Sequence, residues 1–171
     1  MERDLRRWID CLERSAKVIR ELVQEVAPEQ RMWKPDADRW SILEVIAHLL
    51  DEEREDFRVR LRLVLEDPEL EWPPIDPQGW VEQRSYAARN LEETLEGFLE
   101  ERRDSVRWLQ GLADPDWSQA KQHPAGALSA GDLLASWTAH DLLHIRQITW
   151  LHLQYVQQLA RPYSSEYAGE W

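Results

Sequence analysis

Four long stretches of this 171-residue chain repeat hydrophobic residues at every third or fourth position, and proline-rich segments separate them. This spacing is typical of amphipathic helices that bury one face. Only six glycines and a hydrophobic content of 43% favour helices over a glycine-punctuated β sandwich. A chain of this length fits one hydrophobic core. The sequence therefore predicts an all-α fold in which residues 1–171 form a single domain.

The first two helices have clear boundaries in the sequence. The first carries its hydrophobic stripe from Leu5 to Val26 and is expected to end near residue 27. The connection that follows it contains two prolines. The second begins at Ser41, whose side chain can cap the free N–H groups, with Glu44 three residues later to complete a capping box. It is expected to stop near residue 66, where four prolines and a glycine follow.

The last two helices are similarly marked. The third is expected over roughly residues 88–112, with Gly111 and then a proline closing it. The fourth begins after Ser129, an expected N-cap paired with Asp132, and runs to about Gln158. The segment KQHPAGALS before it is interpreted as a loop.

Helices of these lengths can bury their stripes only against one another, which predicts a four-helix bundle. About 20 proline-rich residues separate the second and third helices, enough chain to return along a helix of about 30 Å. Those two helices are therefore expected to run parallel. The predicted order is up-down-down-up, with a long crossover between helices two and three.

Charge and cysteine content narrow the function. The chain has 33 acidic and 21 basic residues, for a formal net charge of −12. That charge repels phosphate backbones and anionic lipid, so neither nucleic acid nor a membrane is an expected partner. No stretch is apolar enough to span a bilayer. The single cysteine, Cys11, is interpreted as a structural thiol in a reducing compartment, and a cytoplasmic location is expected.

The histidines suggest a metal site. His140 and His144 are four residues apart and share one helical face, so both can bind one cation. His48 is the best candidate for a third ligand because it lies beside inward positions of the second helix. Three nitrogens with an open fourth position resemble catalytic zinc sites. The alternative is that these are ordinary core histidines. His123 and His152 are interpreted as non-ligands, with His123 near the mouth of the site.

Carboxylates within one turn of these histidines are candidates to orient the imidazole rings. They are Glu44, Asp51, Glu52 and Asp141, and Gln147 and Arg146 are weaker candidates. An equally good interpretation is that Glu44 only completes the capping box and that Glu52 is a solvated surface charge.

Two segments resemble a known family. The run from Trp40 to Leu49, WSILEVIAHL, and the later HDLLHIRQI from His140 to Ile148 are similar to the DinB-like superfamily, also called the DinB/YfiT-like metalloenzymes. The resemblance spans nearly the whole chain. It implies an up-down-down-up helical bundle, often a homodimer, with a divalent ion held at the positions of His48, His140 and His144.

The resemblance also implies a function. Members with known activity resemble thiol S-transferases that join a low-molecular-weight thiol to an electrophile, so a metal-dependent transferase is the first hypothesis. A metal-dependent hydrolase and a non-catalytic, stress-associated metal-binding dimer are the alternatives. We expect one divalent ion, zinc or nickel, with iron, cobalt or manganese as alternatives, because imidazole nitrogens accept several first-row metals.

Overall fold

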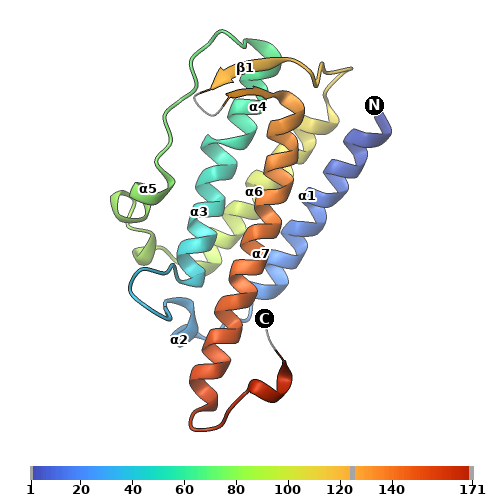
Figure 1. The fold of residues 1–171 in the computed structure, drawn as a ribbon. Coiled ribbons are helices and arrows are strands. Elements are labelled where there is room, and N and C mark those ends of the chain that lie inside the picture. The colour runs from blue at the N-terminus through green and yellow to red at the C-terminus, as the bar shows by residue number, and fades with distance from the viewer. Residues whose placement is uncertain (1, 124–125, 170–171) are drawn as a thin grey trace.

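A computed structural model describes residues 2–123 and 126–169 and shows a bundle of long helices (Figure 1). The bundle consists of α1 (Glu2–Val23), α3 (Ile42–Glu55) continued by α4 (Phe57–Glu66), α6 (Leu91–Gln110) and α7 (Ala130–Ala160). α6 packs against α3 and α1, and α7 packs against α1 and α4. The predicted helical bundle is therefore confirmed.

The direction of the helices follows the predicted order. In Figure 1, α1 and α7 run downward, whereas the α3–α4 pair and α6 both run upward. α3 and α6 are therefore parallel neighbours, and the up-down-down-up arrangement is confirmed. The crossover that this requires contains α5 (Pro77–Gln83) and a 3₁₀ turn, η1 (Tyr86–Ala88), both of which pack on α3.

Side-chain capping fixes the starts of three helices. The Ser41 hydroxyl accepts from the Glu44 backbone N–H at 3.3 Å, and the Glu44 carboxylate accepts from the Ser41 N–H at 2.8 Å. Ser129 and Asp132 form the same capping box at the start of α7. α6 begins at Leu91 rather than near residue 88, because the Asn90 side chain caps it by accepting from the Glu93 N–H at 2.9 Å.

Other boundaries differ from the prediction by a few residues. α1 ends at Val23 instead of near residue 27, and the predicted connection after it contains a one-turn helix, α2 (Pro28–Arg31), that starts at a proline. Proline is favoured in a first turn because it has no N–H to leave unpaired. α6 ends at Gln110, and α7 continues to Ala160 before a short 3₁₀ turn, η2 (Glu166–Ala168).

The second predicted helix contains a break that the hydrophobic pattern does not indicate. Asp56 has φ −115° and ψ −90°, outside the helical range, and separates α3 from α4. Helical hydrogen bonds continue on both sides, from the Asp56 N–H to the Glu52 carbonyl at 3.0 Å and from the Arg60 N–H to the Asp56 carbonyl at 2.8 Å. The break is therefore a local distortion within one nearly continuous rod.

The segment interpreted as a loop before α7 is instead a β hairpin. β1 (Ala120–His123) and β2 (Gly126–Ser129) pair antiparallel, with Ala120 opposite Ser129 and His123 opposite Gly126. Gly126 has φ +114°, a conformation that glycine adopts without steric cost. The Lys121 ammonium group donates to the Pro68 carbonyl at 2.8 Å, which ties the hairpin to the start of the crossover.

One buried arginine joins three helices inside the bundle. Arg102 of α6 is 2% exposed and forms paired hydrogen bonds with Glu53 of α3 and Asp141 of α7, at 2.6–2.9 Å. It also donates to the Leu12 carbonyl of α1 at 3.0 Å, and the Trp137 indole N–H donates to Glu53 at 3.0 Å. The charges are thus paired with one another rather than solvated.

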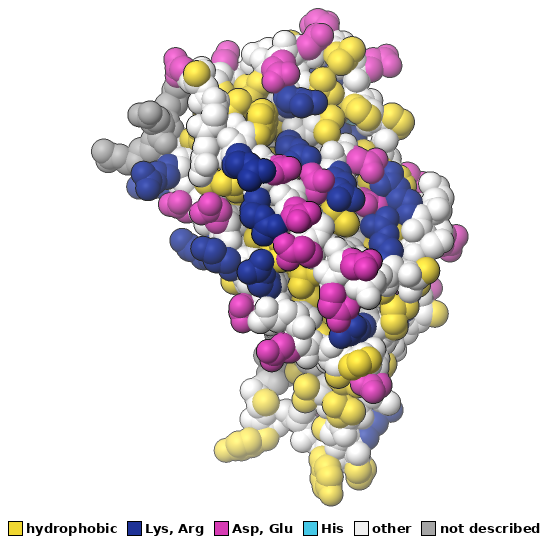
Figure 2. Space-filling view, turned by 180° about the vertical axis from the view of Figure 1, so that it is seen from behind, with side chains coloured by type: hydrophobic (Ala, Val, Ile, Leu, Met, Phe, Trp, Pro, Cys, Tyr) yellow, Lys and Arg dark blue, Asp and Glu magenta, His cyan; other side chains and the backbone are white. Residues whose placement is uncertain are grey.

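The surface carries charges of both signs. Figure 2 shows acidic and basic side chains interspersed over one face, with hydrophobic side chains exposed toward both ends. No helix within the described residues is long and apolar enough to cross a membrane.

Candidate metal centre

Three histidines from two helices meet in the bundle. His48 of α3 places its Nε2 atom 3.3 Å from Nε2 of His140, and Nε2 of His144 lies 3.0 Å from the same atom. Each residue offers one ring nitrogen, and the three nitrogens all lie within 4.8 Å of one another. The structure therefore brings together the three residues singled out in the sequence.

The rings are largely buried, which keeps them neutral. Burial, together with the neighbouring imidazoles, lowers the pKa of His48 to about 3 and that of His140 to about 2. Burial also lowers the pKa of His144. A neutral imidazole nitrogen with a free lone pair is the form that binds metal ions. The donor set therefore fits one first-row divalent cation.

Gln147 orients one of the rings. Its Oε1 atom lies 2.8 Å from Nδ1 of His144, one turn earlier on α7. An amide oxygen only accepts hydrogen bonds, so this contact favours a proton on Nδ1 and a lone pair on Nε2. A residue that the sequence offers only as a weak candidate is therefore in direct contact with the cluster.

Glu52 is the buried carboxylate nearest to the cluster. Its Oε1 atom lies 4.0 Å from Nδ1 of His48, four residues earlier on α3. Burial raises the pKa of Glu52 to about 8, and the nearby Asp56 carboxylate raises it further. The two carboxyl groups share a hydrogen bond, and Arg60 pairs with Asp56 at 2.6 Å. Glu52 is 4% exposed, so its interpretation as a solvated surface charge is wrong.

The other candidate carboxylates have different partners. Asp51 binds Arg84, Arg89 and the Tyr86 hydroxyl, and so anchors the crossover to α3. Asp141 binds Arg102. Glu44 completes its capping box and accepts from Lys34 at 2.7 Å, as the structural interpretation predicts. Arg146 is exposed.

The two remaining histidines lie outside the cluster. His152 contacts the Leu22 carbonyl at 2.7 Å and the Gln30 side chain at 2.8 Å, and so ties α7 to α1 and α2. His123 of β1 packs against Trp72, with ring centroids 5.5 Å apart. It does not line the cavity over the cluster.

A cavity of about 350 Å³ opens directly onto His48 and His144. Its wall comes from the segment before α3, from the start of α5 and from α7: Asp38, Arg39, Trp40, Pro77, Gln78 and Gln147. A second cavity of about 500 Å³ shares four of these residues and continues between the same segment and the crossover, past Lys34 and Glu82. Together they form a groove of the size that holds a small organic molecule.

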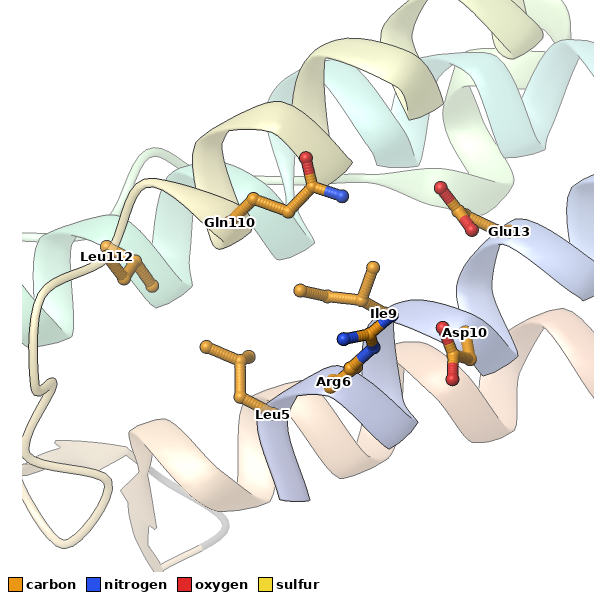
Figure 3. A pocket seen from close by; sticks show the side chains of 7 residues that line it. All are labelled: Leu5, Arg6, Ile9, Asp10, Glu13, Gln110 and Leu112. Carbon is orange, nitrogen blue, oxygen red and sulfur yellow. The ribbon is translucent and has the colours of Figure 1, made fainter. Parts of the chain in front are cut away.

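A larger cavity lies elsewhere. It has a volume of about 710 Å³ between α1 and the end of α6, and Figure 3 shows its side chains. It is lined by Leu5, Arg6, Ile9, Asp10, Glu13, Gln110 and Leu112. None of these residues belongs to the three-histidine cluster, so size alone does not identify the functional site.

Within the described residues, no fourth histidine, cysteine or carboxylate joins the three imidazoles as a potential ligand. Structural zinc sites usually have four protein ligands, whereas catalytic sites usually have three and leave one position for water or substrate. The fold and the cluster together define a helical bundle with a candidate three-histidine metal centre.

The chain belongs to the DinB superfamily, whose sequence model matches residues 12–148. It is 27% identical over 149 residues to a protein of Oceanobacillus iheyensis named "Putative metal-dependent hydrolase", covering 84% of this chain and 83% of that protein. The solved structure of YfiT from Bacillus subtilis has the same fold, with a TM-score of 0.80 at 20% identity over 91% of this chain and 89% of that one. YfiT is described as "a probable metal-dependent hydrolase with an unusual four-helix bundle topology".

Proposed function

We propose that this protein is a divalent-metal-dependent enzyme that acts on a small molecule, with His48, His140 and His144 as the metal ligands. The convergence of three largely buried imidazole nitrogens beside an open groove carries this proposal. A divalent ion held in this way supplies Lewis-acid chemistry and lowers the pKa of a water or thiol at its open position.

The residues around the cluster divide the remaining work. Gln147 accepts from Nδ1 of His144 and keeps the other ring nitrogen available inside the cluster. The Trp40 ring lies 4.9 Å from the His48 ring, and the Phe57 ring lies 5.0 Å from the His140 ring, so each aromatic group covers one side of an imidazole. Asp38, Arg39 and Gln78 line the groove and offer polar groups that orient a substrate.

Hydrolysis is the reaction we favour. The matched Oceanobacillus iheyensis protein is named "Putative metal-dependent hydrolase", and YfiT, which shares the fold, is described as "a probable metal-dependent hydrolase". The groove gives water and a small substrate access to the cluster. Thiol S-transfer is the second candidate, which rests on the family resemblance in the two histidine-bearing segments. The two reactions differ in their nucleophile, so a requirement for added thiol separates them.

The first experiment is elemental analysis of the untagged protein beside a His48→Ala, His140→Ala, His144→Ala triple variant. His152→Ala is the matched control, because this histidine is also on α7 and partly buried but lies outside the cluster. We expect about one divalent ion per chain in the wild type and the control, and none in the triple variant. Equal metal content in the triple variant would show that the ion binds elsewhere.

The second experiment measures turnover. The zinc-loaded and nickel-loaded proteins are tested on panels of esters and amides, and on electrophiles with and without a low-molecular-weight thiol. Turnover without thiol supports the hydrolase, whereas strict dependence on the thiol supports the transferase. Equal turnover by the metal-free triple variant would overturn the proposal.

A further inference from the structure

Two buried polar atoms beside the cluster face each other without touching. Nδ1 of His48 and Oε1 of Glu52 are the atoms, and they lie 4.0 Å apart. Among the described residues, neither atom has a hydrogen-bond partner. A buried donor or acceptor without a partner costs roughly 1–3 kcal/mol, so such a pair is rarely kept without a reason.

The rest of the Glu52 side chain is already held in place. Its carboxyl group hydrogen-bonds with Asp56, and Asp56 pairs with Arg60 at 2.6 Å. Glu52 therefore points one oxygen toward His48 while the groups behind it prevent the carboxylate from turning toward solvent. The side-chain exposures of His48 and Glu52 are 5% and 6%, so both groups are shielded from bulk solvent.

A second ligand shows the same arrangement completed. Nδ1 of His144 contacts an oxygen three residues later on its own helix, at 2.8 Å from Gln147. Nδ1 of His48 faces an oxygen four residues later on its own helix, at a longer distance. In both cases the Nε2 atom points into the cluster. α3 and α7 thus each supply an imidazole together with a side-chain oxygen that faces its Nδ1 atom.

We propose that Glu52 is a positioning residue that accepts a hydrogen bond from Nδ1–H of His48 and so holds Nε2 ready for the metal. The inference rests on the proposed function, because it assumes that His48 is a ligand. A carboxylate behind a ligating imidazole fixes its tautomer and makes it a stronger donor.

The test compares zinc affinity in Glu52→Met and Glu52→Gln variants. Methionine has a similar length but no strong acceptor, so we expect zinc to bind 10- to 100-fold more weakly. Glutamine keeps an oxygen at the same position, as Gln147 does for His144, and should stay within about threefold of the wild type. Glu44→Gln is the matched control, because this buried glutamate lies four residues before His48 and contacts Lys34 instead.

Two further readouts separate positioning from a structural role. ¹⁵N NMR of the histidine rings should show His48 with its proton on Nδ1 in the wild type, and a loss of that preference in Glu52→Met. The metal-free Glu52→Met protein should melt no lower than the metal-free wild type, because the variant removes an incompletely paired buried carboxyl.

Each outcome decides a different point. Zinc binding by Glu52→Met within twofold of the wild type, with an unchanged His48 tautomer, would overturn the role of Glu52 while leaving the metal site intact. A lower melting temperature of Glu52→Met with unchanged affinity would assign Glu52 to stability alone. Failure of the wild type to bind zinc or any other divalent ion would overturn the proposed function and this inference together.

Discussion

The Nε2 atoms of His140 and His144 lie 3.0 Å apart on consecutive turns of α7, and Nε2 of His48 approaches the first of them to 3.3 Å. Neutral nitrogens at these distances repel one another unless a proton or a cation lies between them. The cluster is therefore expected to gain stability when an ion binds.

Zinc should raise the melting temperature of the metal-free protein. Free zinc at about 100 times its dissociation constant adds about 2.7 kcal/mol to the stability of the folded state. For a domain of this size that corresponds to a rise of about 5 to 10 °C. Differential scanning calorimetry checks this, and the triple histidine variant should show no rise. An equal rise in that variant would assign the effect to another site.

The three histidines should make the metal-free protein less stable as the pH falls below about 6.5. Their pKa values are lowered, to about 3 for His48 and about 2 for His140, so the unfolded chain binds protons first. Each such group lowers the free energy of unfolding by about 1.4 kcal/mol per pH unit over that range. Burial raises the pKa of Glu52 to about 8 and also raises the pKa values of Asp56 and Asp141, so these carboxyl groups act in the opposite sense. The contribution of the histidines is therefore the difference between the wild type and the triple histidine variant.

Urea unfolding of the metal-free protein at pH 7, 6 and 5 measures this dependence. The wild type should lose more stability between pH 7 and pH 5 than the triple histidine variant does. The same pH dependence in both proteins would contradict the neutral state of the imidazoles.

Removal of Arg102 should destabilise the bundle strongly. Arg102→Met leaves Glu53 and Asp141 buried without their cation, and losing one partner of a buried ion pair costs about 3–5 kcal/mol. Chemical denaturation measures the loss. The combined Arg102→Met, Glu53→Gln, Asp141→Asn variant removes the charges together and should recover part of it. A combined loss equal to the sum of separate losses would contradict this coupling.

Replacement of Asp51 should loosen the crossover. Asp51→Asn weakens the contacts to Arg84, Arg89 and Tyr86, and hydrogen bonds to a charged group contribute about 1.5–3 kcal/mol. Hydrogen exchange should become faster in residues 77–89 and remain slow in α6. Asp36→Asn is an exposed control on another segment. Unchanged exchange in the crossover would show that Trp80 and Tyr86 hold it by packing alone.

Local patterns explain why so much of the fold could be predicted. Ser41 and Ser129 cap their helices through bonds that span only three residues, so their sequence signals are complete within one turn. The parallel arrangement of α3 and α6 follows from the length of the crossover. The spacing of His140 and His144 is similarly local, and only the choice of His48 required knowing which face of α3 turns inward.

Other features depend on contacts far apart in the chain. Asp51, Glu52 and Glu53 are consecutive acidic residues, which sequence alone would place on the surface. All three are buried. Asp51 contacts the crossover, Glu52 faces the histidine cluster and Glu53 pairs with Arg102. Arg102 lies four residues after Phe98, which places it on the inner face by helical spacing. The sequence does not indicate the β hairpin, because each strand has only four residues and neither strand has a fully buried side chain.

Two of the three histidines are close in the sequence, and the third is far from them. His140 and His144 become neighbours as soon as their own helix forms, whereas His48 lies 92 residues before His140 and joins them only after α3 and α7 have come together. An ion that requires all three nitrogens therefore distinguishes the finished bundle from every incompletely assembled chain.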